Sequence, residues 1–145
     1  MKQQIATTKD QSARLLRCGV SADTADMIYQ TPITASQKAT REDILLVRKA
    51  DKTLFDTDIP AWSLSALLGL LPFKIHNGKY EYWLDIAPMD YGRQWSIGYY
   101  CMEKPRVIKG LTHTDSLIEC AVQEIEWLTA NGYKLKTAHV KRKEE

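Results

Sequence analysis

Apolar and polar residues alternate along residues 79–101, which is the period-two pattern of strands that bury one face. The apolar positions of this predicted face are Tyr80, Tyr82, Leu84, Ile86, Trp95, Ile97, Tyr99 and Cys101. Asn77-Gly78 precedes the segment and predicts a two-residue type I′ hairpin, because both central positions of that turn need positive φ. With a second turn at residues 88–92 and an edge strand at 106–109, the pattern predicts an antiparallel β-meander.

Leucines at helical spacing predict a helix ahead of the meander. The leucines at i, i+3, i+4 and i+7 are Leu64, Leu67, Leu68 and Leu71. Asp58 and Pro60 mark the start of this helix and Pro72 its end, since proline suits a first helical turn and cannot continue a helix. The apolar run at residues 44–48 is rich in strand formers and predicts a short buried strand.

The last predicted helix begins at Thr114 or Asp115, both of which suit an N-cap. Its inner stripe consists of Leu117, Ala121, Ile125 and Leu128. Asn131-Gly132 ends it, because both residues tolerate the left-handed conformation found at helix C-termini.

Two short helices are predicted near the N-terminus. Thr8 and Gln11 have the spacing of a capping box, and Gly19 is a suitable stop for the helix that follows. Ser21 then caps a second helix over residues 22–29.

The predicted order is therefore helix-helix-strand-helix-strand-strand-strand-helix. Consecutive strands joined by short turns favour an α+β fold, with an antiparallel β-meander of three to five strands and helices packed on one face. We expect one domain over residues 1–132 and a flexible basic tail over 133–145. The tail holds five cations and two anions, whereas the rest of the chain has 15 cations against 16 anions.

Composition fits one globular domain in a reducing cytoplasm. The 145 residues are 44% hydrophobic and 26% charged, which provides enough apolar surface for a packed core. The net charge of +2 is too small to imply a polyanionic partner or an anionic membrane. Three cysteines without a CxxC pair indicate free thiols, and no apolar run is long enough to span a bilayer.

No motif in the chain predicts catalysis, a cofactor or a metal. His76, His113 and His139 lie in three separate segments, and none has a Cys or carboxylate at ligand spacing. The chain has no glycine-rich phosphate loop. We therefore expect a non-enzyme, unless a Cys, His or Asp converges with a distant partner in the folded chain.

Aromatic residues are the most informative chemistry in the sequence. The chain has four Trp and seven Tyr, and most lie in the meander. The predicted binding surface consists of Trp62, Trp83, Tyr91 and Tyr100. Trp83 and Tyr100 are out of phase with the inner face of the strands, and Trp62 lies beside the leucine stripe of its helix.

Three interpretations of these aromatics remain open. They pack across strands beneath helices, or they anchor a protein partner, including a second copy of the chain. In the third interpretation they stack the bases of a single-stranded nucleic acid, with phosphate contacts from Lys141, Arg142 and Lys143 in the tail.

Three segments carry a resemblance to a known family. They are GVSADTADMIY at 19–29, DIPAWSLSALLGLLP at 58–72 and SLIECAVQEIEWLTANGYK at 116–134. They resemble segments of a family of small uncharacterised proteins from gut-type bacteria and their prophages. The resemblance implies a bacterial cytoplasmic accessory protein and carries no activity or catalytic residue with it. The leading hypothesis is a small non-enzymatic accessory protein that acts by protein–protein binding.

Overall fold

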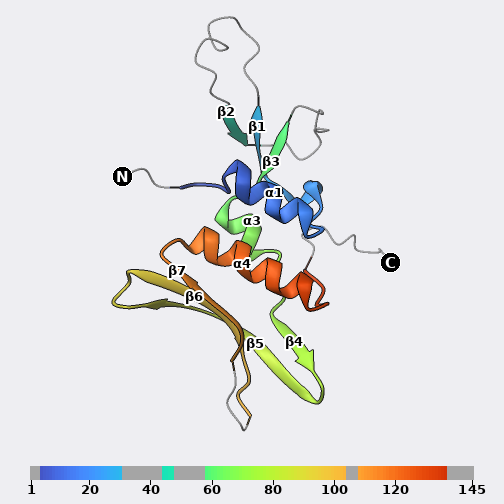
Figure 1. Cartoon of the computed structure of the whole chain (residues 1–145), viewed down its shortest axis with the longest axis vertical. Helices are drawn as coiled ribbons and strands as arrows, with labels where there is room; N and C mark the ends of the chain where they lie inside the picture. The colour runs from blue at the N-terminus through green and yellow to red at the C-terminus, as the bar shows by residue number, and fades with distance from the viewer. Residues whose placement is uncertain (1–3, 31–43, 48–57, 104–107, 137–145) are drawn as a thin grey trace, which may run out of the picture.

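A computed structural model describes residues 4–30, 44–47, 58–103 and 108–136 of the chain (Figure 1). Two antiparallel sheets lie at opposite ends of the molecule, with the helices between them. The elements in chain order are α1 (Lys9–Arg17), the 3₁₀ turn η1 (Ala22–Thr24), β1 (Met27–Gln30), β2 (Ile44–Val47), β3 (Ile59–Ala61), α3 (Leu64–Leu68), β4 (Lys74–Asn77), β5 (Tyr80–Met89), β6 (Gln94–Tyr100), β7 (Ile108–Thr114) and α4 (Leu117–Ala130).

The larger sheet is the predicted meander, with strand order β4-β5-β6-β7 and antiparallel pairing throughout. It curls around α4, which packs on β6 and β7 from one side (Figure 1). Ala121, Ile125 and Leu128 of α4 are fully buried against this sheet and its neighbours. The mixed α+β class and the meander with helices on one face are confirmed.

The first hairpin of the meander forms at the predicted place with a different turn. Asn77 pairs with Tyr80, so the two central residues are Gly78 and Lys79. Of these two, only Gly78 has positive φ, at 68°. Positive φ at the first central position alone is the pattern of a type II′ turn, and glycine is the residue that turn requires there.

The smaller sheet has the order β2-β1-β3, and β1 replaces most of the predicted second helix. Ser21 does cap η1, by accepting from the Asp23 N–H, but the turn ends after three residues. Ile28 then lies in the central strand and is 2% exposed, and β1 pairs with β2 along one edge and with β3 along the other. Pairing with distant strands therefore overrides the local helix signal.

The helix expected from Asp58 is also shorter than predicted. Residues Ile59–Ala61 form β3, an edge strand that tolerates Pro60 because its outer side needs no N–H donor. The helix α3 begins only after Ser63, whose hydroxyl accepts from the Ala66 N–H. The strand predicted at 44–48 is present as β2, but it is not buried as expected, since Leu46 is 39% and Val47 is 76% exposed at this edge of the smaller sheet.

The residues that follow α4, up to Lys136, pack against the rest of the molecule, whereas the sequence predicted a flexible tail from residue 133. Tyr133 stacks on Trp127 with 5.5 Å between ring centroids, and Leu135 packs against the core. The Lys136 N–H donates to the Leu70 carbonyl at 2.8 Å. Residues 133–136 of the predicted tail thus pack against the folded part of the chain, and residues 137–145 lie outside the described ranges.

The first and last helices are joined by an ion-pair network. Arg14 of α1 donates to Glu119 at 2.9 Å and to Glu126 at 2.8 Å, both on α4. Gln11, which closes the predicted capping box with Thr8, also donates to Glu119 at 2.8 Å. We call this set of contacts the Arg14 clamp.

Candidate interaction surface

The outer face of the larger sheet carries a row of side chains that crosses all four strands. Lys74 pairs with Trp83, Trp83 with Tyr100, and Tyr100 with Ile108. Their strand neighbours Tyr82 and Tyr99 point the other way, into the core, where they are 6% and 0% exposed. Because successive residues of a strand alternate between faces, this row points away from the helices.

Leu111 joins this row through a bulge in β7. The pairing of β6 with β7 shifts between Ile97 and Tyr99, and Gly110 adopts a φ of 64° beside the shift. A Cβ on Gly98 would lie 3.0 Å from Ile108 and 3.3 Å from Leu111, so both side chains close over this glycine. The bulge therefore places Leu111 beside Ile108 on the outer face.

We define the outer-face cluster as Trp83, Tyr100, Ile108 and Leu111. Trp83 and Ile108 are each 46% exposed, Leu111 is 51% exposed and Tyr100 is half-buried. Figure 1 shows the described helices on the opposite side of this sheet. The cluster is thus an apolar patch that no described helix covers.

Charged groups around the cluster largely neutralise one another. Glu81 accepts from Lys74 and contacts His76, at 3.2 Å each. Lys74 also lies over the Trp83 ring, with 5.1 Å from Nζ to the ring centroid. Hydrogen bonds from Lys74 and His76 lower the pKa of Glu81. In the described part of the chain, the rim of the cluster beside Trp83 is therefore polar and carries little net charge.

Trp62 is a core residue, and the expectation that it lies at an interface rim is wrong. Its side chain is 0% exposed. The indole N–H donates to Thr24 Oγ1 at 2.9 Å, and its backbone N–H donates to Thr7 Oγ1 at 3.0 Å. An aromatic residue beside a helical stripe gives no sequence signal that distinguishes burial in this way from exposure.

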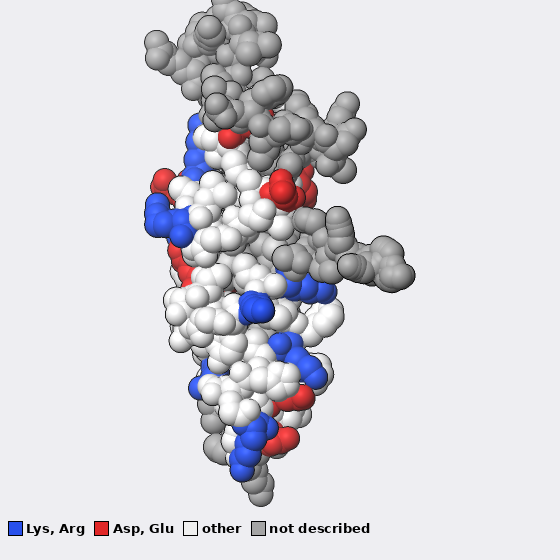
Figure 2. All heavy atoms as spheres, turned by 90° about the vertical axis from the view of Figure 1, so that its right-hand side faces the viewer, with Lys and Arg blue, Asp and Glu red and all other residues white. Residues whose placement is uncertain are grey.

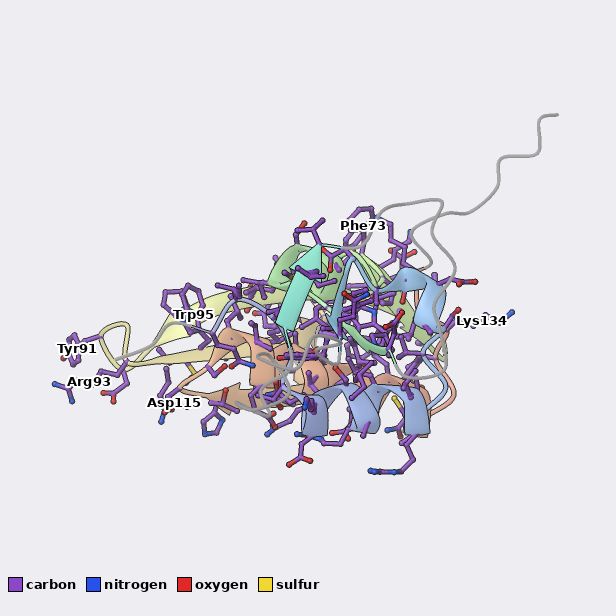
Figure 3. The ribbon with its side chains drawn as sticks, turned by 90° about the horizontal axis from the view of Figure 1, so that it is seen from above. Phe73, Tyr91, Arg93, Trp95, Asp115 and Lys134 are labelled. Atoms are coloured by element: carbon purple, nitrogen blue, oxygen red, sulfur yellow. The ribbon has the colours of Figure 1, made fainter. Side chains whose placement is uncertain are left out.

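Tyr91 is exposed but lies apart from the outer-face cluster. It sits in the turn after β5 with a φ of 58° and is 99% exposed. Figure 3 shows Tyr91 and Arg93 projecting from the far tip of the molecule. Met89 lies six positions after Trp83 along β5. At about 3.3 Å per residue, the turn therefore begins roughly 20 Å from Trp83.

The structure thus brings together two of the four predicted surface aromatics, Trp83 and Tyr100. It adds Ile108, which lies within the predicted edge strand but was not assigned to a face, and Leu111, which lies beyond the predicted end of that strand at residue 109. Alternation through β7 would have found Ile108, but the bulge breaks the pattern before Leu111. The tail residues Lys141, Arg142 and Lys143 lie outside the described part of the chain.

Thr112 links the two titratable side chains Cys120 and Glu124 inside the core. Glu124 is fully buried, and burial raises its pKa to about 8. Cys120 contacts Thr112 Oγ1 at 3.2 Å, and burial raises the pKa of its thiol. No group of three or more His, Cys, Asp and Glu residues with metal-binding geometry occurs within the described ranges.

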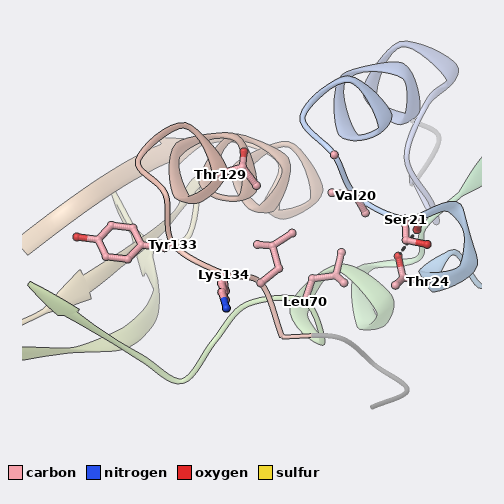
Figure 4. A pocket seen from close by; sticks show the side chains of 9 residues that line it. Val20, Ser21, Thr24, Leu70, Thr129, Tyr133 and Lys134 are labelled. Atoms are coloured by element: carbon pink, nitrogen blue, oxygen red, sulfur yellow. Dashed lines mark hydrogen bonds between the residues drawn. The ribbon is translucent and has the colours of Figure 1, made fainter. Parts of the chain in front are cut away.

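One hollow of about 360 Å³ lies between the end of α1, the end of α3 and the residues after α4 (Figure 4). Val20, Leu70 and Leu135 contribute to its wall. Its threonine hydroxyls are already engaged, because Thr24 donates to the Ser21 carbonyl and Thr129 to the Ile125 carbonyl. A ligand in this hollow would therefore contact mostly apolar side chains.

None of the described helices combines the length and apolarity needed to cross a membrane. No protein-family model matches the chain, and neither a curated protein sequence nor a solved structure shows significant similarity to it. The surfaces themselves are therefore the basis for inferring function.

Proposed function

We propose that this protein is a non-enzymatic binding module whose outer-face cluster contacts another protein. The supporting observation is the row of large apolar side chains that runs from Trp83 through Tyr100 to Ile108 and Leu111. These side chains are contiguous and lie on a sheet face that no described helix covers. A patch of this kind is typical of interaction sites on soluble proteins.

The composition of the cluster favours a protein partner over a polyanion. Protein interfaces combine an aromatic and aliphatic centre with a polar rim, and Trp and Tyr are their commonest anchors. Among the described residues, Lys74, which lies over the Trp83 ring, is already paired with Glu81, and Asp85 adds a negative charge on the same face. This balance gives phosphate groups little to contact.

A second copy of the chain is one partner that fits, and a different protein is the other. The three segments that resemble proteins of gut-type bacteria and their prophages support a bacterial cytoplasmic setting. In that setting the protein acts as an accessory factor that binds a host or phage component.

Sedimentation velocity across micromolar concentrations tests self-association first. Leu111→Asp places a charge in the cluster, and we expect it to abolish a dimer. Tyr91→Ala is the matched control, because Tyr91 is more exposed but lies outside the cluster. If the wild-type chain is a monomer, affinity capture from nuclease-treated lysate follows with the same three proteins.

The expected result is a dimer or a captured protein that Leu111→Asp loses and Tyr91→Ala retains. A monomer that captures no protein in a Leu111-dependent way contradicts the proposal. Circular dichroism of each variant confirms that a loss of binding is not a loss of folding.

A further inference from the structure

Three lysines near one end of the larger sheet lie over aromatic rings instead of beside carboxylates. The pairs, measured from Nζ to ring centroid, are Lys79 over Tyr80 at 5.5 Å, Lys109 over Tyr82 at 5.5 Å and Lys136 over Phe73 at 3.9 Å. Among the described residues, no Asp or Glu forms an ion pair with any of the three lysines. Their positive charges are therefore not neutralised by this part of the chain.

The rings of these pairs lie on the helix side of the sheet, opposite the outer-face cluster. Tyr80 and Tyr82 alternate onto the same face of β5. Lys109 faces the same side, because it pairs with Tyr99, whose buried ring points into the core. Phe73 lies immediately before β4, where its carbonyl accepts from the Leu84 N–H at 2.8 Å.

Residues after α4 complete this side of the sheet. The bond from the Lys136 N–H to the Leu70 carbonyl holds Lys136 beside the chain that leads to Phe73. Tyr133, stacked on Trp127, lies close enough to Tyr82 to interact with it electrostatically. Aromatic rings from β5, from Phe73 after α3, and from Trp127 and Tyr133 at the end of α4 thus lie on this side of the sheet.

We define the lysine–aromatic face as Phe73, Lys79, Tyr80, Lys109 and Lys136. Figure 1 shows the β4–β5 hairpin turning below the end of α4. Lys79 and Lys136 are exposed here, whereas the inward side chains Ile75 and Tyr82 of the hairpin are only 4% and 6% exposed. Figure 2 faces this side of the molecule and shows basic side chains distributed over its lower half, with acidic side chains near the bottom. Phe73 is 65% exposed.

We infer that the lysine–aromatic face binds single-stranded nucleic acid, as a site separate from the outer-face cluster. Phosphates contact the three lysines, and an unpaired base stacks on the exposed ring of Phe73. Single-stranded nucleic acid supplies both anions and flat ring faces, and this face presents the complement of both. A duplex hides its ring faces, and an acidic peptide offers carboxylates without a partner for Phe73.

Binding of a labelled oligo-dT and oligo-U of about 16 nucleotides, followed by fluorescence anisotropy at several salt concentrations, tests this inference. The double variant Lys79→Gln/Lys136→Gln removes two cations from the face. For single strands, each lost phosphate contact reduces the slope of log K against log salt by about 0.7, so we expect a reduction of about 1.4. Lys74→Gln is the matched control, since Lys74 lies on the other face and is paired with Glu81.

Phe73→Ala separates stacking from simple charge attraction. Loss of one base–aromatic stack predicts a roughly 10-fold weaker affinity with an unchanged salt slope, and Phe73→Trp restores it. Because Phe73 is mostly exposed, these substitutions leave the core intact, which thermal unfolding of each variant checks.

Four results overturn the inference. They are no binding of either oligonucleotide at low salt, equal losses in the Lys74 control, binding that is insensitive to Phe73→Ala, and equal affinity for poly-glutamate or for duplex DNA. Binding lost only on substitution of Lys141, Arg142 and Lys143 assigns the contact to the tail and also overturns it. None of these outcomes bears on the protein-binding proposal, which depends on Leu111 and the opposite face.

Discussion

Glu124 of α4 and Thr112 of β7 face each other inside the core, with 3.5 Å between Glu124 Oε1 and Thr112 Oγ1. The second carboxyl oxygen, Glu124 Oε2, has no hydrogen-bond partner among the described residues. Burial raises the pKa of this group from 4.5 to about 8, so most molecules hold it uncharged at neutral pH. An ionised Glu124 at this position lacks both solvent and a cation.

This burial predicts that the protein loses stability as pH rises. Between pH 4.5 and about 8 the unfolded chain has released the Glu124 proton and the folded chain has not. The free energy of unfolding therefore falls with pH in this window, by up to about 1.4 kcal/mol per unit, and levels off above it. Urea unfolding from pH 5 to 9 measures this slope.

Glu124→Gln should remove the slope, because the amide does not titrate. Asp85→Asn is the control, since it makes the same charge change at an exposed position and should keep the slope. A wild-type stability that does not change over this pH range contradicts the prediction.

The Arg14 clamp predicts a stability effect of the opposite pH dependence. Arg14→Met leaves Glu119 and Glu126 without their cation and should cost about 1–2 kcal/mol, a value limited by the partial exposure of the pair. Burial acts to raise the pKa of Glu119, but hydrogen bonds from Arg14, Gln11 and Gln123 outweigh it and the pKa is lowered.

The contribution of Glu119 is therefore present above the ordinary carboxyl pKa and is lost as pH falls through the lowered folded value. Arg17→Met is the matched control, because exposed Arg17 makes no ion pair with the described residues. Chemical denaturation of both variants at pH 7 and at pH 3 provides the comparison. Equal losses for the two arginines would show that the clamp contributes nothing.

Gly110 has no room for a side chain. A Cβ there would lie 2.5 Å from the Trp127 ring, and the φ of 64° already disfavours other residues. Gly110→Ala should cost about 2–4 kcal/mol, from the backbone and from overpacking together. Gly92→Ala has a similar positive φ with no atom within 4 Å, so it should cost only about 1 kcal/mol.

The contact with Trp127 can be separated from the backbone cost by a double variant. Gly110→Ala/Trp127→Leu should be less destabilised than the sum of the two single variants, because the leucine leaves space for the methyl group. Thermal unfolding of the four proteins gives the coupling, and strict additivity contradicts the predicted clash.

The buried bond from Trp62 to Thr24 predicts a selective effect at Thr24. Thr24→Val keeps the shape but leaves the indole N–H without an acceptor, which should cost about 1–3 kcal/mol. Thr24→Ser keeps the hydroxyl and should lose less. Equal urea midpoints for the two variants would contradict an essential role for this bond.

The parts of the fold that the sequence predicted are those set by local patterns. Alternation along β5 and β6 and the helical stripe of α4 each lie within one segment, so the period alone identifies the buried face. The predicted cap at Ser21 is also a local feature, and the structure confirms it. Residues Met27–Gln30 nevertheless form a strand, because β2 and β3, which are more distant in the sequence, pair with its two edges.

The candidate surfaces depend on contacts that no local pattern contains. Trp62 is buried because Thr24 and Thr7 accept its N–H groups across 38 and 55 residues. A bulge in β7 places Leu111 on the outer face. A hydrogen bond from the Lys136 N–H to the Leu70 carbonyl holds Lys136 near Phe73. The residue types therefore indicated which side chains could take part in binding. The face on which each side chain lies could be determined only from the folded structure.

The Arg14 clamp also means that this chain can finish folding only after most of it has been synthesised. Its partners lie 105 and 112 residues after Arg14, so α1 leaves the ribosome long before the carboxylates that hold it exist. The same late helix supplies Ile125 and Leu128 to the core. Until α4 has left the ribosome and packed on β6 and β7, the apolar inner face of the larger sheet lacks its cover, and partly folded chains of this kind are the ones that chaperones recognise.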